Sequence, residues 1–268
     1  MTAQCRFCAT LLQHVFADLG MSPLSNRFIA AGDLDKAESF YPLKTWVCEK
    51  CLLVQLEEFE APAEIFQDYV YFSSYSASWL EHASRYVEMI TGRVWLDDAS
   101  LVMELASNDG YLLQYFQAKG IPSLGIEPAS NVAEVAREKG INTIDEFFGV
   151  ELAKKLLQKG LQADLLLGNN VLAHVPDLND FVAGMKLVLK PDGTITMEFP
   201  HLLQLMLFTQ FDTIYHEHFS YFSLYTVMQV FASHGLRIYD VEQLPTHGGS
   251  LRIYACHADN SSLQNAAA

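Results

Sequence analysis

The sequence lacks any long hydrophobic run. No apolar stretch reaches the roughly 18–20 residues that a membrane-spanning helix needs. Residues 1–10 contain neither a basic cluster nor a long apolar segment, so they do not resemble a secretory signal peptide. We therefore expect a cytoplasmic protein that has no membrane partner.

Basic residues are also scarce, because 17 lysines and arginines face 32 acidic residues and the formal net charge is −15. Contacts to nucleic-acid phosphates require a basic face, so we expect no nucleic-acid partner. A small anionic substrate remains compatible with a local basic pocket. Half of the 268 residues are hydrophobic, which indicates a packed globular protein with room for one large and one small domain. We expect it to be a monomer.

The few cysteines are clustered. Four of the five form two Cys-x-x-Cys pairs, Cys5 with Cys8 and Cys48 with Cys51, while Cys256 stands alone within a strand pattern. In a reducing compartment, two such pairs favour a metal over disulfides. Four thiolates match a structural tetrahedral zinc site and leave no position for a catalytic water. Redox-active dithiols and an iron–sulfur cluster are the alternatives.

The pattern along the chain suggests four segments. Residues 1–60 are predicted to form a small, irregular zinc-binding domain that needs the metal to hold it together. Residues 61–98 are expected to form a connector with one helix at about 78–91. Residues 99–260 are predicted to form the main domain, and residues 261–268 a tail.

The main domain alternates short apolar strands with helices. The expected strands are 100–106, 123–127, 163–168 and 194–199, and the expected helices are 111–119, 131–139, 150–159 and 178–189. Such strands are typical of a parallel sheet covered on both faces, so we predict a doubly wound, Rossmann-like α/β fold. After a helix at 224–234, strands 237–243 and 250–257 are joined by a linker too short for a helical crossover. We expect them to form an antiparallel hairpin.

A tight turn, Glu104-Leu-Ala-Ser-Asn-Asp-Gly110, follows the first of these strands. It does not match the G-x-G-x-x-G pattern, which disfavours a nicotinamide cofactor. Glu127, at the end of the second strand, is placed to accept hydrogen bonds from both hydroxyls of a ribose. Many α/β proteins have small residues and an acid at these places. Acidic residues without a phosphate-binding glycine nest nevertheless favour a cationic ligand without phosphate, and we predict S-adenosylmethionine.

Six motifs in order resemble the S-adenosylmethionine-dependent sugar C-methyltransferases of deoxysugar biosynthesis. They are ELASNDGYLL (104–113), GIEP (125–128), NNVLAHVPD (169–177), EFPH (198–201), YHEHFSY (215–221) and HGGSLR (247–252). The paired cysteine motifs fit the same family, and the resemblance extends from residue 5 to about 257. It implies methyl transfer to the carbon next to a ketone (C3) of a nucleotide-linked 4-keto-deoxysugar, through an enolate.

These motifs also indicate the site residues. The predicted cofactor-binding residues are Glu104, Ala106, Asn108, Asp109, Gly110, Glu127, Pro128, Asn169, Asn170 and Val171. A carbon next to a ketone becomes a nucleophile once a base removes its proton and the enolate is stabilised. We predict His218 as that base, because imidazole titrates near neutral pH.

Other polar residues are expected around this base. Glu217 could orient His218 or a substrate hydroxyl, and Tyr215 and Tyr71 could donate hydrogen bonds to the ketone oxygen. The resemblance implies a tyrosine from the 69–75 stretch, of which we choose Tyr71. It also places His174 at the cofactor end of the cleft. The alternatives are that His-Glu-His binds a metal, that His218 is structural, or that the tyrosines only pack between domains.

The chain departs from the family at its end. Family members usually continue into a C-terminal α/β domain that helps to hold the nucleotide-sugar, whereas this sequence ends soon after the last motif. It is either a fragment or a natural short form. The alternative functions are therefore a truncated, non-catalytic module that binds S-adenosylmethionine, or an O- or N-methyltransferase for another small molecule.

Overall fold

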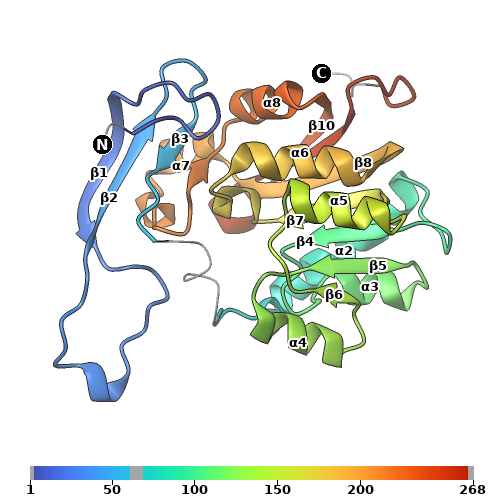
Figure 1. The fold of residues 1–268 in the computed structure, drawn as a ribbon, viewed down its shortest axis with the longest axis horizontal. Coiled ribbons are helices and arrows are strands. Elements are labelled where there is room, and N and C mark those ends of the chain that lie inside the picture. The colour runs from blue at the N-terminus through green and yellow to red at the C-terminus, as the bar shows by residue number, and fades with distance from the viewer. Residues whose placement is uncertain (1–2, 61–68, 265–268) are drawn as a thin grey trace.

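The computed structural model describes residues 3–60 and 69–264, which contain two sheets (Figure 1). The smaller sheet has the strand order β1-β2-β3-β9, and the larger has the order β10-β11-β8-β7-β4-β5-β6. The strands are β1 (His14–Ser22), β2 (Tyr41–Val47), β3 (Val54–Leu56), β4 (Val102–Leu105), β5 (Ser123–Ile126), β6 (Thr143–Ile144), β7 (Ala163–Asn169), β8 (Leu189–Pro200), β9 (Ser220–Tyr221), β10 (Leu236–Leu244) and β11 (Ser250–His257).

The helices connect these strands. The α-helices are α2 (Ala77–Arg93), α3 (Leu113–Ala118), α4 (Ser130–Glu138), α5 (Val150–Gln158), α6 (Leu178–Val188), α7 (Leu202–Phe208) and α8 (Leu224–Ser233). Short 3-10 helices are η1 (Ala31–Asp33), η2 (Ser73–Tyr75), η3 (Leu172–His174), η4 (Phe211–Thr213) and η5 (Thr246–Gly248). Within the described ranges, no helix is both long enough and apolar enough to span a bilayer.

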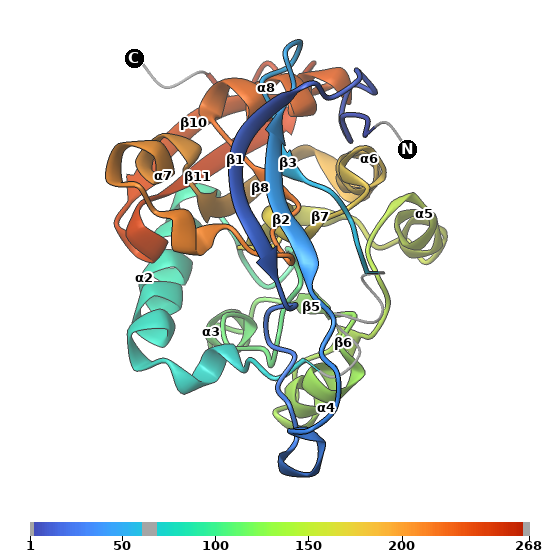
Figure 2. The same ribbon diagram turned by 90° about the vertical axis from the view of Figure 1, so that its left-hand side faces the viewer.

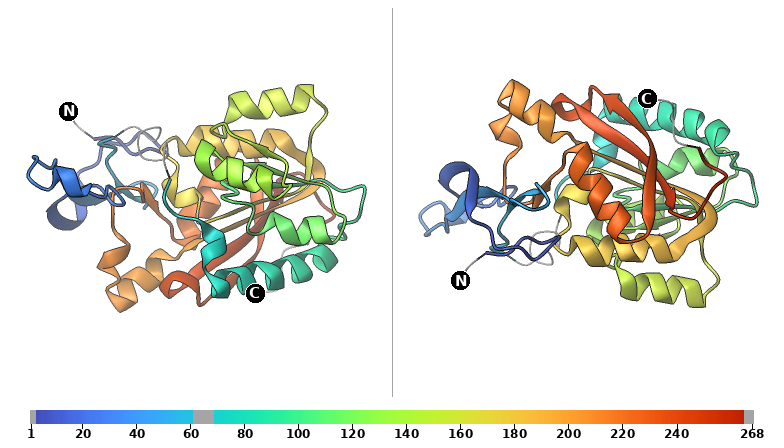
Figure 3. Two further views of the ribbon diagram at one scale, coloured as in Figure 1. Left: turned by 90° about the horizontal axis from the view of Figure 1, so that it is seen from below. Right: turned by 90° about the horizontal axis from the view of Figure 1, so that it is seen from above.

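The larger sheet confirms the predicted doubly wound fold. Strands β6, β5, β4, β7 and β8 pair in parallel, whereas β11 pairs antiparallel with both β8 and β10. Helices α5, α6 and α8 cover one face, and α2 and α3 cover the other (Figures 2 and 3). The carboxyl ends of the parallel strands, where ligands bind in such folds, are therefore left open between the two helical layers.

The core follows the alternation of side chains along the strands. In β7, Leu166 packs in the cluster beneath α5, α6 and α8, whereas Leu165 and Leu167 pack in the cluster beneath α2 and α3. All three side chains are fully buried. Because successive side chains point to opposite faces, a strand covered on both sides must be apolar throughout, which explains why the sequence revealed it.

The prediction of an irregular zinc-binding domain is wrong in detail. Strands β1 and β2 form a long antiparallel hairpin, β3 pairs with β2, and β9 of the main domain joins β3 (Figure 2). Most of β1 is exposed, so no alternating apolar pattern marks it. Its order depends on pairing with β2 across the 23–40 loop, which sequence periodicity does not reveal. Helix α7 and the short strand β6 were also not predicted.

Candidate active site and zinc centre

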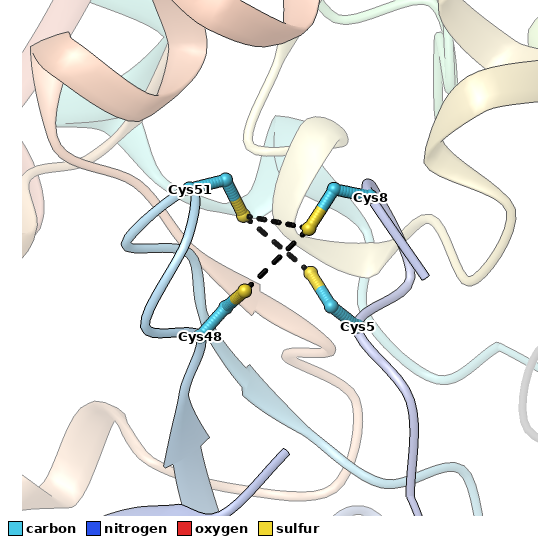
Figure 4. Close-up of side chains that lie close together, drawn as sticks. All are labelled: Cys5, Cys8, Cys48 and Cys51. Carbon is cyan, nitrogen blue, oxygen red and sulfur yellow. Dashed lines mark hydrogen bonds between the residues drawn. The ribbon is translucent and has the colours of Figure 1, made fainter. Parts of the chain in front are cut away.

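The four paired cysteines converge from two loops (Figure 4). Their Sγ atoms all lie within 4.8 Å of one another, with 3.5 Å between Cys5 and Cys51 and 3.5 Å between Cys8 and Cys48. A disulfide requires about 2.05 Å between its sulfurs. A tetrahedron with Zn–S bonds of about 2.3 Å requires sulfurs about 3.8 Å apart, so the cluster fits zinc.

Both knuckles use the same local turn. In each, the residue after the second cysteine adopts the left-handed conformation, with φ of 57° at Ala9 and 61° at Leu52. The amide of that residue donates to the carbonyl of the first cysteine, Cys5 or Cys48, at 2.9 Å in both cases. The side chain of Gln55 donates from Nε2 to Cys5 Sγ at 3.2 Å, which supports the charge of a thiolate.

A cavity of about 710 Å3 opens at the carboxyl ends of the parallel strands. Its wall is formed by the turns that follow β4 and β5, the segment after β7, the 69–79 stretch and the loop before β9. Among the described lining residues there is no lysine or arginine, while Glu127, Asp177, Asp180 and Glu217 are acidic. Such a lining favours a cationic ligand over a phosphate, which fits a sulfonium cofactor.

The turn after β4 is held in a strained shape. Ala106, Asn108 and Gly110 all have positive φ, at 54°, 49° and 75°. This conformation costs free energy in residues other than glycine, and such strain is frequent at ligand-binding sites. The side chain of Asn108 fixes the turn to the stretch above it, since its Oδ1 accepts from the Ser73 amide at 2.8 Å and its Nδ2 donates to the Tyr71 carbonyl at 3.1 Å.

Glu127 lies at the end of β5 with its carboxylate on the cavity wall. Its two oxygens accept hydrogen bonds from the amides of Asn108 and Ala129, both at 2.9 Å. Burial raises the pKa of Glu127 to about 7. The carboxylate is thus oriented by the main chain, and each oxygen keeps a lone pair that could accept a ribose hydroxyl.

His218 also lines the cavity, and its tautomer follows from its partners. Its Nδ1 lies 2.9 Å from the carbonyl oxygen of Thr213 and must carry the proton, because a carbonyl only accepts. Its Nε2 therefore holds the lone pair and accepts from the Tyr215 hydroxyl at 2.8 Å. Burial lowers the pKa of His218 to about 4, so Nε2 is unprotonated at neutral pH.

The neighbours of His218 complete a buried polar wall. The ring of His174 meets that of His218 edge-on, with 4.7 Å between the ring centroids. Glu217 Oε1 accepts from Asn26 Nδ2 at 2.8 Å, and burial raises the pKa of Glu217. Burial, and to a smaller extent the negative charge of Glu217, raise the pKa of Tyr215. The Tyr215 hydroxyl therefore keeps its proton and acts as a donor.

A buried ionic cluster supports the other side of the cavity. Glu198, at the end of β8, accepts from His82 Nε2 at 2.9 Å, Arg252 Nη2 at 2.8 Å and Thr246 Oγ1 at 2.9 Å. The bond to Thr246 holds the turn in which His247 adopts a φ of 52° and lines the cavity. Each hydrogen-bonded charge in the cluster is paired, as burial requires.

Most of the predicted site residues share this cavity. The lining includes His218, Tyr215, Glu217, Tyr71, His174, Ala106, Asn108, Glu127, Pro128, Asn169, Asn170 and Val171. Three predicted cofactor residues do not line it. Glu104 is fully buried in β4, Asp109 accepts from Lys139 and Ser74, and Gly110 packs where a Cβ would lie 2.8 Å from Ile141.

Several lining residues were not predicted. Asn26 reaches the cavity from the loop between β1 and β2, and 191 positions separate it from its partner Glu217. Nothing in the local sequence marks it. Tyr69 lines the cavity as Tyr71 does. Burial, and to a smaller extent the charge of Glu217, raise the pKa of Tyr69. The aromatic pair Phe147 and Phe148, between β6 and α5, also lines the cavity.

Two family models match the chain. One described as "Putative zinc binding domain" matches residues 5–66, and one described as "Methyltransferase domain" matches residues 79–241. The C-methyltransferase NovU of Streptomyces niveus is 36% identical over 255 residues, which are 95% of this chain and 61% of NovU. The chain thus spans 61% of the length of this curated relative.

Solved structures share the fold. A S-adenosylmethionine-dependent methyltransferase from Clostridium acetobutylicum ATCC 824 matches with a TM-score of 0.52 and 11% identity, over 66% of this chain and 92% of that chain. Magnesium protoporphyrin IX methyltransferase from Synechocystis PCC 6803, with bound S-adenosylhomocysteine, matches with a TM-score of 0.50 and 14% identity, over 66% of this chain and 81% of that chain. The cofactors of this chain are therefore S-adenosylmethionine and a zinc ion, for which the four clustered thiolates supply the ligands. The chain therefore belongs to the methyltransferase family whose model matches residues 79–241, and it carries a zinc-binding domain at its N-terminus.

Proposed function

We propose that this protein transfers a methyl group to C3 of a nucleotide-linked 4-keto-deoxysugar, with His218 as the base. The observation that carries the proposal is that His218, whose Nε2 is unprotonated, lines the same cavity as Glu127. A base and a cofactor-holding acid in one cavity are what methylation of carbon requires. The similarity to a C-methyltransferase supports the same chemistry.

The residues of the cavity divide into two groups. Glu127 would hold the ribose of S-adenosylmethionine, and the strained turn at Ala106 and Asn108 would let the main chain approach it closely. When bound, S-adenosylmethionine supplies an electrophilic methyl group on a sulfonium. Asn169, Asn170 and the other predicted cofactor residues of the lining surround the same space.

The second group would generate the carbon nucleophile. The C3 proton, acidified by the neighbouring ketone, passes to Nε2 of His218. For this to happen, the Tyr215 hydroxyl gives up its hydrogen bond to Nε2 and donates to the ketone oxygen instead, where negative charge develops. Tyr71 donates to the same oxygen in our proposal, and Glu217 binds a sugar hydroxyl or stabilises the imidazolium of His218.

The acidic lining also limits what enters the cavity. Diphosphates bind to basic groups, and the described lining has no lysine or arginine. We therefore place only the sugar ring inside, with the nucleotide beyond the cavity rim. The oxygen of the ketone would then face the Tyr215 and His218 wall.

Replacement of His218 by glutamine tests the assignment of the base. Glutamine keeps a polar side chain but cannot take up a proton, so methyl transfer to a thymidine-linked 4-ketosugar should fall by about 10²- to 10⁴-fold. Binding of S-adenosylhomocysteine, measured by calorimetry, should change little because His218 is not assigned to the cofactor. Methylation that persists in His218→Gln would remove the base assignment. A product methylated on oxygen or nitrogen, with its C3 proton retained, would favour the rival functions.

A further inference from the structure

Arg6 lies inside the first zinc knuckle, between the ligands Cys5 and Cys8, and is largely buried. Its guanidinium donates from Nη1 to the Pro176 carbonyl at 2.8 Å and from Nη2 to the Leu56 carbonyl at 2.5 Å. Burial lowers the pKa of Arg6 to about 10, so it stays charged at neutral pH. A side chain in the metal loop therefore donates from both Nη1 and Nη2 to acceptors outside that loop.

The first acceptor belongs to the cavity. Pro176 lines it together with His174, Val175 and Asp177 on the segment that follows β7. The hydrogen bond from Arg6 to the Pro176 carbonyl thus connects the zinc knuckle to the cavity wall directly.

The second acceptor leads to the proposed base. Leu56 ends β3, and its amide donates to the Phe219 carbonyl at 3.0 Å. The ring of Phe219 also lies against the Arg6 guanidinium, with 5.3 Å from Cζ to the ring centroid. Phe219 directly follows His218. The Arg6 guanidinium therefore contacts both β3, which pairs with the segment that carries His218, and the Phe219 ring of that segment.

The main chain of Arg6 is fixed as firmly as its side chain. Its amide donates to Gln55 Oε1 at 2.9 Å, while Gln55 Nε2 donates to Cys5 Sγ at 3.2 Å. Asn179 of α6 donates from Nδ2 to the Arg6 carbonyl at 3.3 Å. The position of the guanidinium is therefore set by the folded metal loop.

We propose that Arg6 is a positioning residue of the active site, through which the zinc knuckle sets the cavity wall at 173–177 and the segment that carries His218. The zinc then determines active-site geometry in addition to local folding. This inference rests on the proposed function only for the role of His218 as base. Cofactor affinity and the environment of the His218 ring, the two quantities measured below, do not depend on that role.

The matched control is Gln229 of α8. Its Nε2 donates to the Cys51 carbonyl at 3.1 Å, so it also joins the zinc loops to the main domain. It does not line the cavity. Replacement of Gln229 by methionine should therefore weaken the attachment of the zinc loops without moving the active site.

The experiment compares Arg6→Met, Arg6→Lys and Gln229→Met with the wild type. Zinc content, S-adenosylhomocysteine affinity by calorimetry, and the imidazole signals of His218 in the NMR spectrum are measured for each, with the signals assigned through His218→Gln. Arg6→Met should retain one zinc per chain, bind S-adenosylhomocysteine about tenfold or more weakly, and show displaced His218 signals. Arg6→Lys keeps the charge but not the planar fork, so its affinity should lie between the two.

The Gln229→Met control separates a positioning role of Arg6 from a merely structural one, because only a positioning role makes the two variants differ. Gln229→Met should bind S-adenosylhomocysteine as the wild type does, with unmoved His218 signals. Wild-type affinity in an Arg6 variant that holds its zinc would overturn the proposal. Equal losses of affinity in Gln229→Met and Arg6→Met would overturn it too, as would loss of zinc from both Arg6 variants.

Discussion

Glu127 is a buried carboxyl group whose ionised form suits the proposed contact with the ribose of the cofactor. Burial raises its pKa to about 7, so near neutral pH the folded protein holds it partly protonated. A cationic ligand whose ribose hydroxyls donate hydrogen bonds favours the ionised carboxylate. Binding below pH 7 should therefore release a proton.

We predict that the affinity for S-adenosylmethionine rises about tenfold between pH 5.5 and 7.5 and then levels off, because the pKa of Glu127 is crossed in that window. Calorimetry in two buffers of different ionisation enthalpy measures both the affinity and the proton released. Glu127→Gln should bind more weakly, with a flat profile. A pH dependence that survives in this variant would show that another group is responsible.

Single residues were predictable where one local motif carries both the residue and its place in the fold. Glu127 follows the expected strand 123–127, whereas His218 was predicted from the YHEHFSY motif (215–221), and both line the cavity. Asn26 was not predictable, because its partner lies 191 positions away. The choice between Tyr71 and Tyr69 is also beyond local reasoning, since both line the cavity and only the tertiary structure sets the surroundings of each hydroxyl.

At the scale of elements, β9 links the zinc-binding sheet to the histidine-bearing loop. It pairs with β3 through Val54 and Gln55, and begins two residues after His218. Gln55 also donates to a zinc ligand. The order of β9 should therefore depend on the metal, although β9 itself is far from the cysteines in the sequence.

We predict that removal of zinc by a chelator speeds amide hydrogen exchange in β1, β2, β3 and β9 while β4, β5, β7 and β8 stay protected. The metal stabilises the small sheet, which has too little core of its own, whereas the large sheet is buried on both faces. Mass spectrometry of peptides from each strand follows the exchange, and added zinc should restore protection. Unchanged exchange in β9 after removal of zinc would contradict the claim that the order of β9 depends on the metal.

The elements that could be predicted are those whose pattern reflects burial on both faces. Strands β4, β5 and β7 and the buried part of β8 at 194–199 are short, mainly apolar runs, and the helix predicted at about 78–91 matches α2 (Ala77–Arg93). Helix α7 shows the limit, since six of the seven residues of LLQLMLF are apolar, and Leu207 and Phe208 are exposed. A short run that is almost wholly apolar has no period that distinguishes a helix from a strand.

At the scale of the whole molecule, the cavity is assembled from parts that no single segment contains. The main sheet supplies Glu127, the loop before β9 supplies His218, and the zinc-binding part supplies Asn26. The expected fold class and the zinc ligands could be derived from the sequence, because each has a signature of spacing. The way in which the small sheet encloses the cavity could not, because it depends on pairing between β3 and β9 across the chain.

The most direct measurement of the central claim is deuterium exchange at C3 of a thymidine-linked 4-ketosugar in D2O, with S-adenosylhomocysteine present so that no methyl can be transferred. The wild type should introduce deuterium at C3 faster than an enzyme-free control, and His218→Gln should match that control. Exchange that is equally fast in His218→Gln, or absent from the wild type, would contradict the account.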